Sequence, residues 1–283
     1  MSRMTIRRAL VGDKSSTCLR GLVWLMTFSF LAAAEGADSE GAGFDHSALN
    51  RVLSTHVDSS GKVDYARLKV EPADLDAYVD QLAAISPESH PDRFPDRAHR
   101  LAYWINAYNG FVLKGVVDAY PVKSVKDIKF LSGFFNRTWF TAGGEEYTLN
   151  EIEHGILRER FQEPRIHAAI NCASVGCPRL PQEIFRPEDL EQQLERGMQF
   201  FVGEERNVKL DPGTNTIYLS SIFDWFEDDF TGWVERKHGV DDARITDYLV
   251  LYLEPNERLY LEEHPEIRME HLKYDWALND KGR

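Results

Sequence analysis

The feature that most constrains the fold is a long apolar segment that begins near Pro95 and ends at Tyr120, just before Pro121. Proline cannot continue a helix and disfavours helical backbone at the residue before it. Trp104 and Phe111 add a second apolar flank to a stripe that recurs at helical spacing. The stripe consists of Leu101, Ile105, Tyr108, Val112, Val116 and Ala119. Because a helix that is apolar on most sides packs inside a domain, we predict a central helix over residues 95–120.

Shorter elements are predicted on both sides of this helix. Earlier helices are expected from Asp45 to about Val57 and after Pro72, and later ones at 187–202 and 243–253. A T-x-x-E capping box, Thr148 to Glu151, opens a helix in LNEIEHGILRER. TWFTAGGEEYT and NVKLDPGTNTIYL predict hairpins, and MEHLKYDWALN is a strand-like closing segment. Without regular βαβ alternation, this order predicts an α+β fold of helices packed on a small antiparallel sheet, as one domain over residues 44–283.

The first 34 residues differ from the rest of the chain. Five basic residues precede the apolar run LVWLMTFSFLAAA, and Asp13 is the one acidic residue in the first 34 positions. This pattern is typical of a secretory signal peptide, with an uncleaved membrane anchor as the alternative. We therefore expect a secreted or periplasmic protein without stable membrane insertion after cleavage, and a flexible lead-in over residues 35–43.

The charge balance excludes one class of partner. The 283-residue chain has a net charge of −13, and loss of residues 1–34 lowers the 33 basic residues to 28 and the 46 acidic residues to 45. Nucleic-acid binding depends on a basic surface that displaces counterions. We therefore predict no nucleic-acid partner.

Two cysteines remain once Cys18 is assigned to the signal segment. Cys172 and Cys177 lie in NCASVGCP, where small residues allow backbone amides to approach a reacting group closely, as an oxyanion-binding turn requires. In an oxidising compartment the pair can form a disulfide. A catalytic thiol and a metal ligand are the alternatives, and the local pattern leaves all three open.

A cysteine nucleophile requires a base, and the LNEIEHGIL segment offers one. His154 is the candidate base, with Glu151 or Glu153 to orient it. Glu153 falls on the apolar side of the predicted helix, where a carboxylate requires a partner. His167 and Asn171 are four residues apart and share a face in either a helix or a strand.

Candidate substrate-binding residues are Asn106, Asn109, Asn171 and Ser174. Asn106 and Asn109 are three residues apart on one face of the apolar segment, within WINAYN. Buried amides require hydrogen-bond partners. These two side chains therefore either hold neighbouring backbone or face a ligand.

Metal ligation is disfavoured by spacing. Zinc would use His154, His167, Cys172 and Cys177, whose spacing matches none of the common zinc motifs. The acidic run 227–229 lacks the spacing of a calcium loop and is interpreted as a solvated turn. We predict neither a metal nor a cofactor.

Several motifs, in order, resemble the domain of unknown function 547 family, from about residue 60 to 279. They are LAYWINAYNGFVL, YTLNEIEHGILR, RIHAAINCASVGCPRL, IYLSSIFDWFEDDF and KYDWALN. The resemblance implies a papain-like or transglutaminase-like α+β core with a Cys-His-Glu site. By motif, the thiol falls in NCASVGCP, the His and Glu fall in LNEIEHGIL, and His167 precedes the thiol.

The resulting hypothesis is an exported thiol-dependent hydrolase or acyl-transfer enzyme that acts on a peptide or peptide-like amide. In it Cys172 attacks, His154 is the base, and Cys177 is a resolving or bridging partner. The alternative is a non-catalytic exported binding module for a small peptide or thiol compound, with Cys172 and Cys177 bridged.

Overall fold

The computed structural model describes residues 43–129 and 133–282. The predicted signal peptide, Cys18 and residues 35–42 of the expected lead-in lie outside the described residues. Among the helices of the described ranges, none combines the length and the apolar character that a membrane span requires.

Helices make up most of the described chain. The α-helices are α1 (Ser47–His56), α2 (Tyr65–Val70), α3 (Ala73–Ala84), α4 (Arg97–Ala119), α5 (Gly133–Arg137), α6 (Glu159–Phe161), α7 (Leu190–Val202), α8 (Ser221–Trp225), α9 (Glu227–His238), α10 (Ile245–Leu249) and α11 (Pro255–Glu263). Short 3-10 helices are η1 (Pro91–Arg93), η2 (Val125–Asp127) and η4 (Pro164–Ala168). The segment η3 (Glu151–Arg158) is a π-helix.

Two small sheets complete the fold. β1 (Trp139–Ala142) and β2 (Glu145–Thr148) form the first predicted hairpin, and β3 (Val208–Asp211) and β4 (Thr216–Ser220) form the second. β5 (Arg268–Leu272) pairs with β4 in parallel, so the expectation of a single antiparallel sheet is wrong. A parallel neighbour requires a long crossover, and here α8 to α11 provide it.

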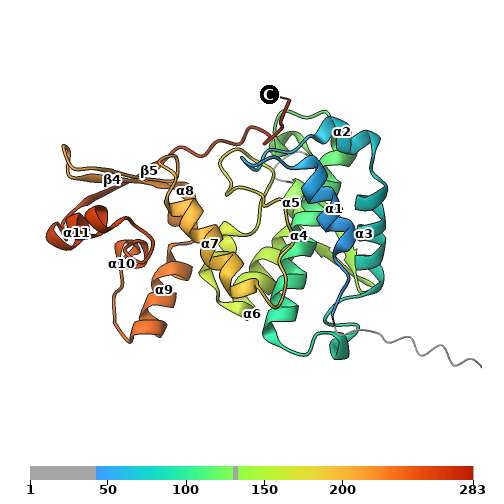
Figure 1. Ribbon diagram of the computed structural model, residues 1–283, viewed down its shortest axis with the longest axis horizontal. Coiled ribbons are helices and arrows are strands. Elements are labelled where there is room, and N and C mark those ends of the chain that lie inside the picture. Colours follow the sequence, from blue (N-terminus) through green and yellow to red (C-terminus); the bar gives the residue numbers. More distant parts are fainter. Residues whose placement is uncertain (1–42, 130–132, 283) are drawn as a thin grey trace, which may run out of the picture. The chain divides into compact units, whose positions relative to one another are not determined.

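The predicted central helix is α4, which is buried along most of its length. Its first turn is capped by Asp96, whose side chain accepts a hydrogen bond from the His99 backbone N–H. α3 packs against α4 and α1 packs against α3, as Figure 1 shows. Leu49 of α1, Leu75 of α3 and residues of α4 belong to one buried apolar cluster. This cluster fixes the helix that supplies Tyr108 and Asn109 to the site described below.

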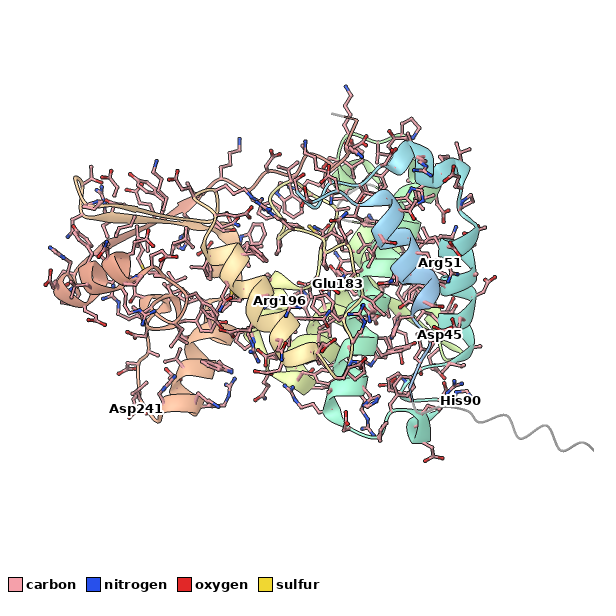
Figure 2. The ribbon with its side chains drawn as sticks, in the orientation of Figure 1. Asp45, Arg51, His90, Glu183, Arg196 and Asp241 are labelled. Atoms are coloured by element: carbon pink, nitrogen blue, oxygen red, sulfur yellow. The ribbon has the colours of Figure 1, made fainter. Side chains whose placement is uncertain are left out.

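A second apolar cluster is formed by the later elements. Phe223, Phe230 and Tyr248 contribute to it from α8, α9 and α10. α7 takes part in both clusters, because its first half faces the earlier one and its second half the later one. Figure 2 labels Arg196 on α7 and Glu183 on the preceding loop, which form an ion pair at 3.7 Å.

The α+β class, both hairpins and the main helices are confirmed, whereas a papain-like core finds no support in the structure. The helix expected at 243–253 is α10 followed by turns, and α2, α9 and α11 went unpredicted. The first turn of α9 is acidic, so too few of its apolar residues recur at helical spacing to predict a helix. The predicted capping box is present, since Glu151 accepts from the Thr148 N–H at 2.8 Å.

Gly110 provides a test of the packing between α4 and α3. A Cβ atom at Gly110 would lie 2.6 Å from Cε1 of Tyr78, a buried ring whose hydroxyl is hydrogen-bonded to His46. Gly110→Ala is therefore expected to lower the free energy of unfolding by about 1–3 kcal/mol, measured by urea denaturation. Gly155→Ala is the control, because no atom beyond its chain neighbours and its own helical turn lies within 4 Å of its Cβ position. Equal losses in the two variants would contradict the packing argument.

Candidate functional site

The candidate site centres on Cys172 and Cys177, which are both free thiols in the structure. Their Sγ atoms lie 2.6 Å apart, which is longer than the bond of about 2.05 Å in a disulfide but inside the van der Waals contact distance of two sulfurs. The backbone N–H of Cys172 donates to Cys177 Sγ at 3.0 Å. The loop thus brings the two sulfurs together and directs a backbone donor at one of them.

An asparagine scaffold holds this loop in place. Asn171 accepts a hydrogen bond from the Ala173 N–H at 2.7 Å and donates to the carbonyl of Pro178, also at 2.7 Å. Ala173 has a φ of 64°, an uncommon conformation for a residue with a side chain. Its carbonyl accepts from the Asn279 N–H, so hydrogen bonds on both sides stabilise the strained turn between the sulfurs.

Two hydroxyl groups surround the sulfurs. Ser174 Oγ lies 2.9 Å from Cys172 Sγ, and the Tyr274 hydroxyl lies 3.3 Å from Cys172 Sγ and 3.1 Å from Cys177 Sγ. The Tyr274 ring also packs on Gly176, where a Cβ atom would come within 2.9 Å of it. The small residue at Gly176 therefore permits a tyrosine 97 residues beyond Cys177 to reach the sulfurs.

These contacts separate the acidities of the two thiols. Burial acts to raise the pKa of Cys177, but hydrogen bonds from Cys172, Ser174 and Tyr274 outweigh it and lower the pKa to about 6. The hydrogen bond to Cys177, together with burial, raises the pKa of Cys172 well above its usual range. The pair therefore holds one proton and one negative charge at neutral pH.

Both sulfurs line a pocket of about 250 Å³. Acid–base groups from three separate segments line the same pocket, namely Tyr108, Glu153, His154 and His167. Among the predicted catalytic residues, Cys172, Cys177, Glu153, His154 and His167 are thus brought together. Glu151 is exposed and lies outside this pocket, since its carboxylate caps Thr148.

Glu153 projects from the π-helix η3. Its carboxylate accepts a hydrogen bond from the Tyr108 hydroxyl at 2.8 Å. Burial raises the pKa of Glu153 to about 7; the Tyr108 hydrogen bond opposes this rise and negative charge at Cys177 adds to it. A π-helix is a rare element that is enriched at functional sites. The carboxylate is therefore poised between its two protonation states at neutral pH.

The two histidines belong to a charged network with Arg158 and Asp229. Arg158 donates to both carboxylate oxygens of Asp229, at 2.6 and 3.0 Å, and to Nδ1 of His154 at 2.9 Å. His167 Nε2 lies 2.7 Å from Asp229. Because a guanidinium only donates, Nδ1 of His154 accepts, and the neutral ring carries its proton on Nε2.

Burial keeps both histidines neutral, and the hydrogen bonds of the network keep Asp229 ionised. Burial, then Arg158, lowers the pKa of His154, and burial lowers the pKa of His167. Burial acts to raise the pKa of Asp229, but hydrogen bonds from His167 and Arg158 outweigh it, and the pKa falls well below its usual range. Among the described contacts, no hydrogen bond joins His154 to Glu151, Glu153 or a cysteine.

The buried asparagines hold backbone. Asn106 donates to the carbonyl of Phe185 and accepts from its N–H, and Asn109 does the same between Ala169 and Asn171. These amides lie outside the pocket lining, as does Ser174, which contacts the sulfurs from another side. The substrate-binding role expected for Asn106, Asn109, Asn171 and Ser174 stays a prediction.

Three residues of the site were missed by the sequence analysis as functional groups. Tyr108 was assigned to the apolar stripe of the central helix, Asp229 to a solvated acidic turn, and Tyr274 to the closing segment. Tyr108 lies two residues from Asn106, a spacing that carries no chemical signal. Asp229 and Tyr274 approach the cysteine segment only through long-range folding, so no local motif marks them.

No group of three or more His, Cys, Asp or Glu side chains in the described ranges is placed to hold a metal ion. His154 and His167 are engaged by Arg158 and Asp229, while the cysteines are hydrogen-bonded to each other. The zinc alternative therefore has no geometric support.

Residues 92–202 match the model of the family DUF547, which is described as a protein of unknown function. This match supports the family resemblance and covers α4, η3, the cysteine loop and α7. The family description names no activity, so it lends no support to the likeness to cysteine peptidases and transglutaminases. Comparison with curated proteins and with solved structures gave no match.

The raised pKa of Glu153 predicts a pH dependence of stability. Because the pKa rises from 4.5 to about 7 on folding, its stabilising contribution is fully present below about pH 4.5 and is lost as pH rises through 7. The free energy of unfolding of the wild type, relative to Glu153→Gln, should therefore fall between these pH values in urea denaturation. The exposed Glu146→Gln is the control. A difference that is constant across this range would contradict the assignment.

Proposed function

We propose that this chain is an exported thiol-dependent hydrolase or acyl-transfer enzyme that acts on a peptide or peptide-like amide. The observation that carries the proposal is the convergence of Cys172, Cys177 and Glu153 on one pocket. Export rests on the signal-like pattern of residues 1–34.

Cys172 is the nucleophile, because it is the more exposed of the two residues. Its proton passes to the thiolate of Cys177, 2.6 Å away, as the bond to the substrate carbon forms, because the pKa order of the two thiols disfavours a free Cys172 thiolate. A thiolate is a far better nucleophile than a thiol. The cysteine pair thus supplies its own base, in place of the histidine that the sequence suggested.

Glu153 is the acid–base group for the rest of the reaction. It is chosen over the histidines because its pKa is about 7 and responds to charge at Cys177. Cys172 Sγ bonds to the amide carbon, the carbon–nitrogen bond breaks, and the leaving nitrogen takes a proton from Glu153. The ionised Glu153 then removes a proton from water, and the hydroxide attacks the thioester carbon. The carbon–sulfur bond breaks, and Cys172 takes back the proton that Cys177 had accepted.

Acetylation by p-nitrophenyl acetate tests this proposal in reduced protein. Cys172 should be acetylated faster than N-acetylcysteine at pH 7, as followed by intact mass and peptide mapping. Cys172→Ala should abolish the adduct, and Glu153→Gln should slow its hydrolysis by about 100-fold. Cys177→Ser should slow acetylation by at least about 10-fold, because it removes the thiolate partner.

Glu146→Gln, which alters an exposed carboxylate on β2, is the matched control and should behave like the wild type. Acetylation of other residues at the same rate, or a hydrolysis rate that is unchanged in Glu153→Gln, would contradict the proposed roles.

The sulfur separation of 2.6 Å also favours a second candidate, a non-catalytic binding module for a small peptide or thiol compound with the cysteines bridged. Intact mass before and after reduction, on protein isolated from an oxidising compartment, separates the two. A quantitative bridge that resists a glutathione buffer favours the binding module.

A further inference from the structure

Three aromatic rings form one side of the cysteine pocket, and the chemistry above uses only the hydroxyl group of one of them, Tyr274. Trp225 of α8 packs on Tyr274 with ring centroids 4.9 Å apart, and Tyr274 packs on Trp276 at 4.6 Å. Trp225 and Trp276 are stacked at 5.8 Å with an interplanar angle of 25°. These three residues, here called the aromatic wall, all line the pocket.

Trp225 is the open member of the aromatic wall. Its side chain is 46% exposed, although it lies beside a pocket that Phe135, Ile222 and Phe226 also line. Lys126 Nζ lies 3.9 Å from the centre of the Trp276 ring and so occupies one face of that indole. The indole of Trp225 is therefore the ring of the wall best placed to accept a ligand.

The aromatic wall lies directly beside the sulfurs. Tyr274 belongs to the wall through its ring, and its hydroxyl is 3.3 Å from Cys172 Sγ. A group stacked on Trp225 would thus be a close neighbour of an amide carbonyl that Cys172 attacks. The wall is in the right place to select the side chain next to the reacting bond.

The charges around the pocket favour a neutral group on the wall. The thiolate of Cys177 disfavours an anion, whereas Lys126 at Trp276 disfavours a cation. Neutral aromatic rings pack on one another in offset or edge-to-face geometry. Such a pair contributes more binding free energy than the burial of its apolar area alone.

The volume also fits a single ring. An apolar cavity of about 150 Å³ holds benzene. The pocket of about 250 Å³ therefore has room for one six-membered ring and for the atoms that join it to a reacting carbonyl.

We propose that the aromatic wall binds an aromatic side chain next to the reacting amide carbonyl, and that Trp225 determines this preference. The inference rests on the proposed function for the identity of the reacting group. The binding itself requires no thiol chemistry.

Binding of three small amides tests the inference. Dissociation constants of N-acetylphenylalaninamide, N-acetylcyclohexylalaninamide and N-acetylalaninamide are measured by NMR titration, in the reduced wild type and in Cys172→Ala. The phenyl amide should bind about two- to ten-fold more tightly than the cyclohexyl amide, which has similar bulk without a π system. The alanyl amide should bind most weakly.

Variants locate the preference. Trp225→Leu should remove the difference between the phenyl and cyclohexyl amides, and Trp225→Phe should retain it. Trp139→Leu is the matched control, because Trp139 is 55% exposed on β1 and lies outside the pocket lining. It should bind all three amides as the wild type does.

Equal affinity for the phenyl and cyclohexyl amides, no effect of Trp225→Leu, or binding of none of the amides would overturn the inference. Tighter, Trp225-dependent binding of methyl glucoside would overturn it too, because the wall would then recognise a sugar. Because Cys172→Ala cannot form a thioester, these failures are distinct from a failure of Cys172 acetylation, which would overturn the proposed function alone.

Discussion

The close approach of Cys172 Sγ and Cys177 Sγ, at 2.6 Å, is the contact on which the rest of the site depends. Two sulfurs at this distance cannot both carry a charge, so they share one proton and their acidities separate. The approach is produced by the backbone, since Asn171 and Asn279 hold Ala173 in a left-handed turn between them. Asn109 of α4 in turn holds the N–H of Asn171. The geometry of the sulfurs is therefore anchored to α4, which is buried along most of its length.

The electrostatics of the pocket follow from this anchoring. A negative charge at Cys177 is stabilised by hydrogen bonds from Cys172, Ser174 and Tyr274 rather than by a cation. Burial, with a smaller contribution from that charge, raises the pKa of Glu153 to about 7. The guanidinium of Arg158 does not contact the sulfurs, because it is paired with Asp229 and packs over the ring of Phe226. The result is a pocket whose proton carriers are coupled to one another, while Arg158 and Asp229 of the neighbouring ion pair act on the pKa of Glu153 in opposite directions.

The sequence was sufficient for features that rest on local patterns. The apolar stripe predicted α4, paired glycines predicted the β1–β2 turn, and the T-x-x-E motif predicted the cap on η3. The grouping of cysteine, histidine and glutamate residues in neighbouring motifs also predicted that Cys172, Glu153 and His167 belong to one site, and all three line one pocket.

What the sequence could not provide depends on contacts between distant segments. Tyr274 reaches the sulfurs from about 100 residues away, and Asp229 meets His167 across 62 residues. The π-helical form of η3 was also hidden, because its apolar residues suit an ordinary helix equally well. The role of Asn109 was left open between backbone and ligand, and only the tertiary structure shows that its amide holds the cysteine loop.

The most direct test of the central claim is a thiolate titration of the reduced Cys18→Ser protein, which retains only Cys172 and Cys177, followed by ultraviolet absorbance. The account predicts one thiolate per molecule with a midpoint near pH 6, and a second thiol that stays protonated well above the usual range. In Cys172→Ala the remaining midpoint should rise, because Cys177 loses its hydrogen bond from Cys172. Two thiols that titrate together near pH 9 would contradict a shared proton and, with it, the account of the site.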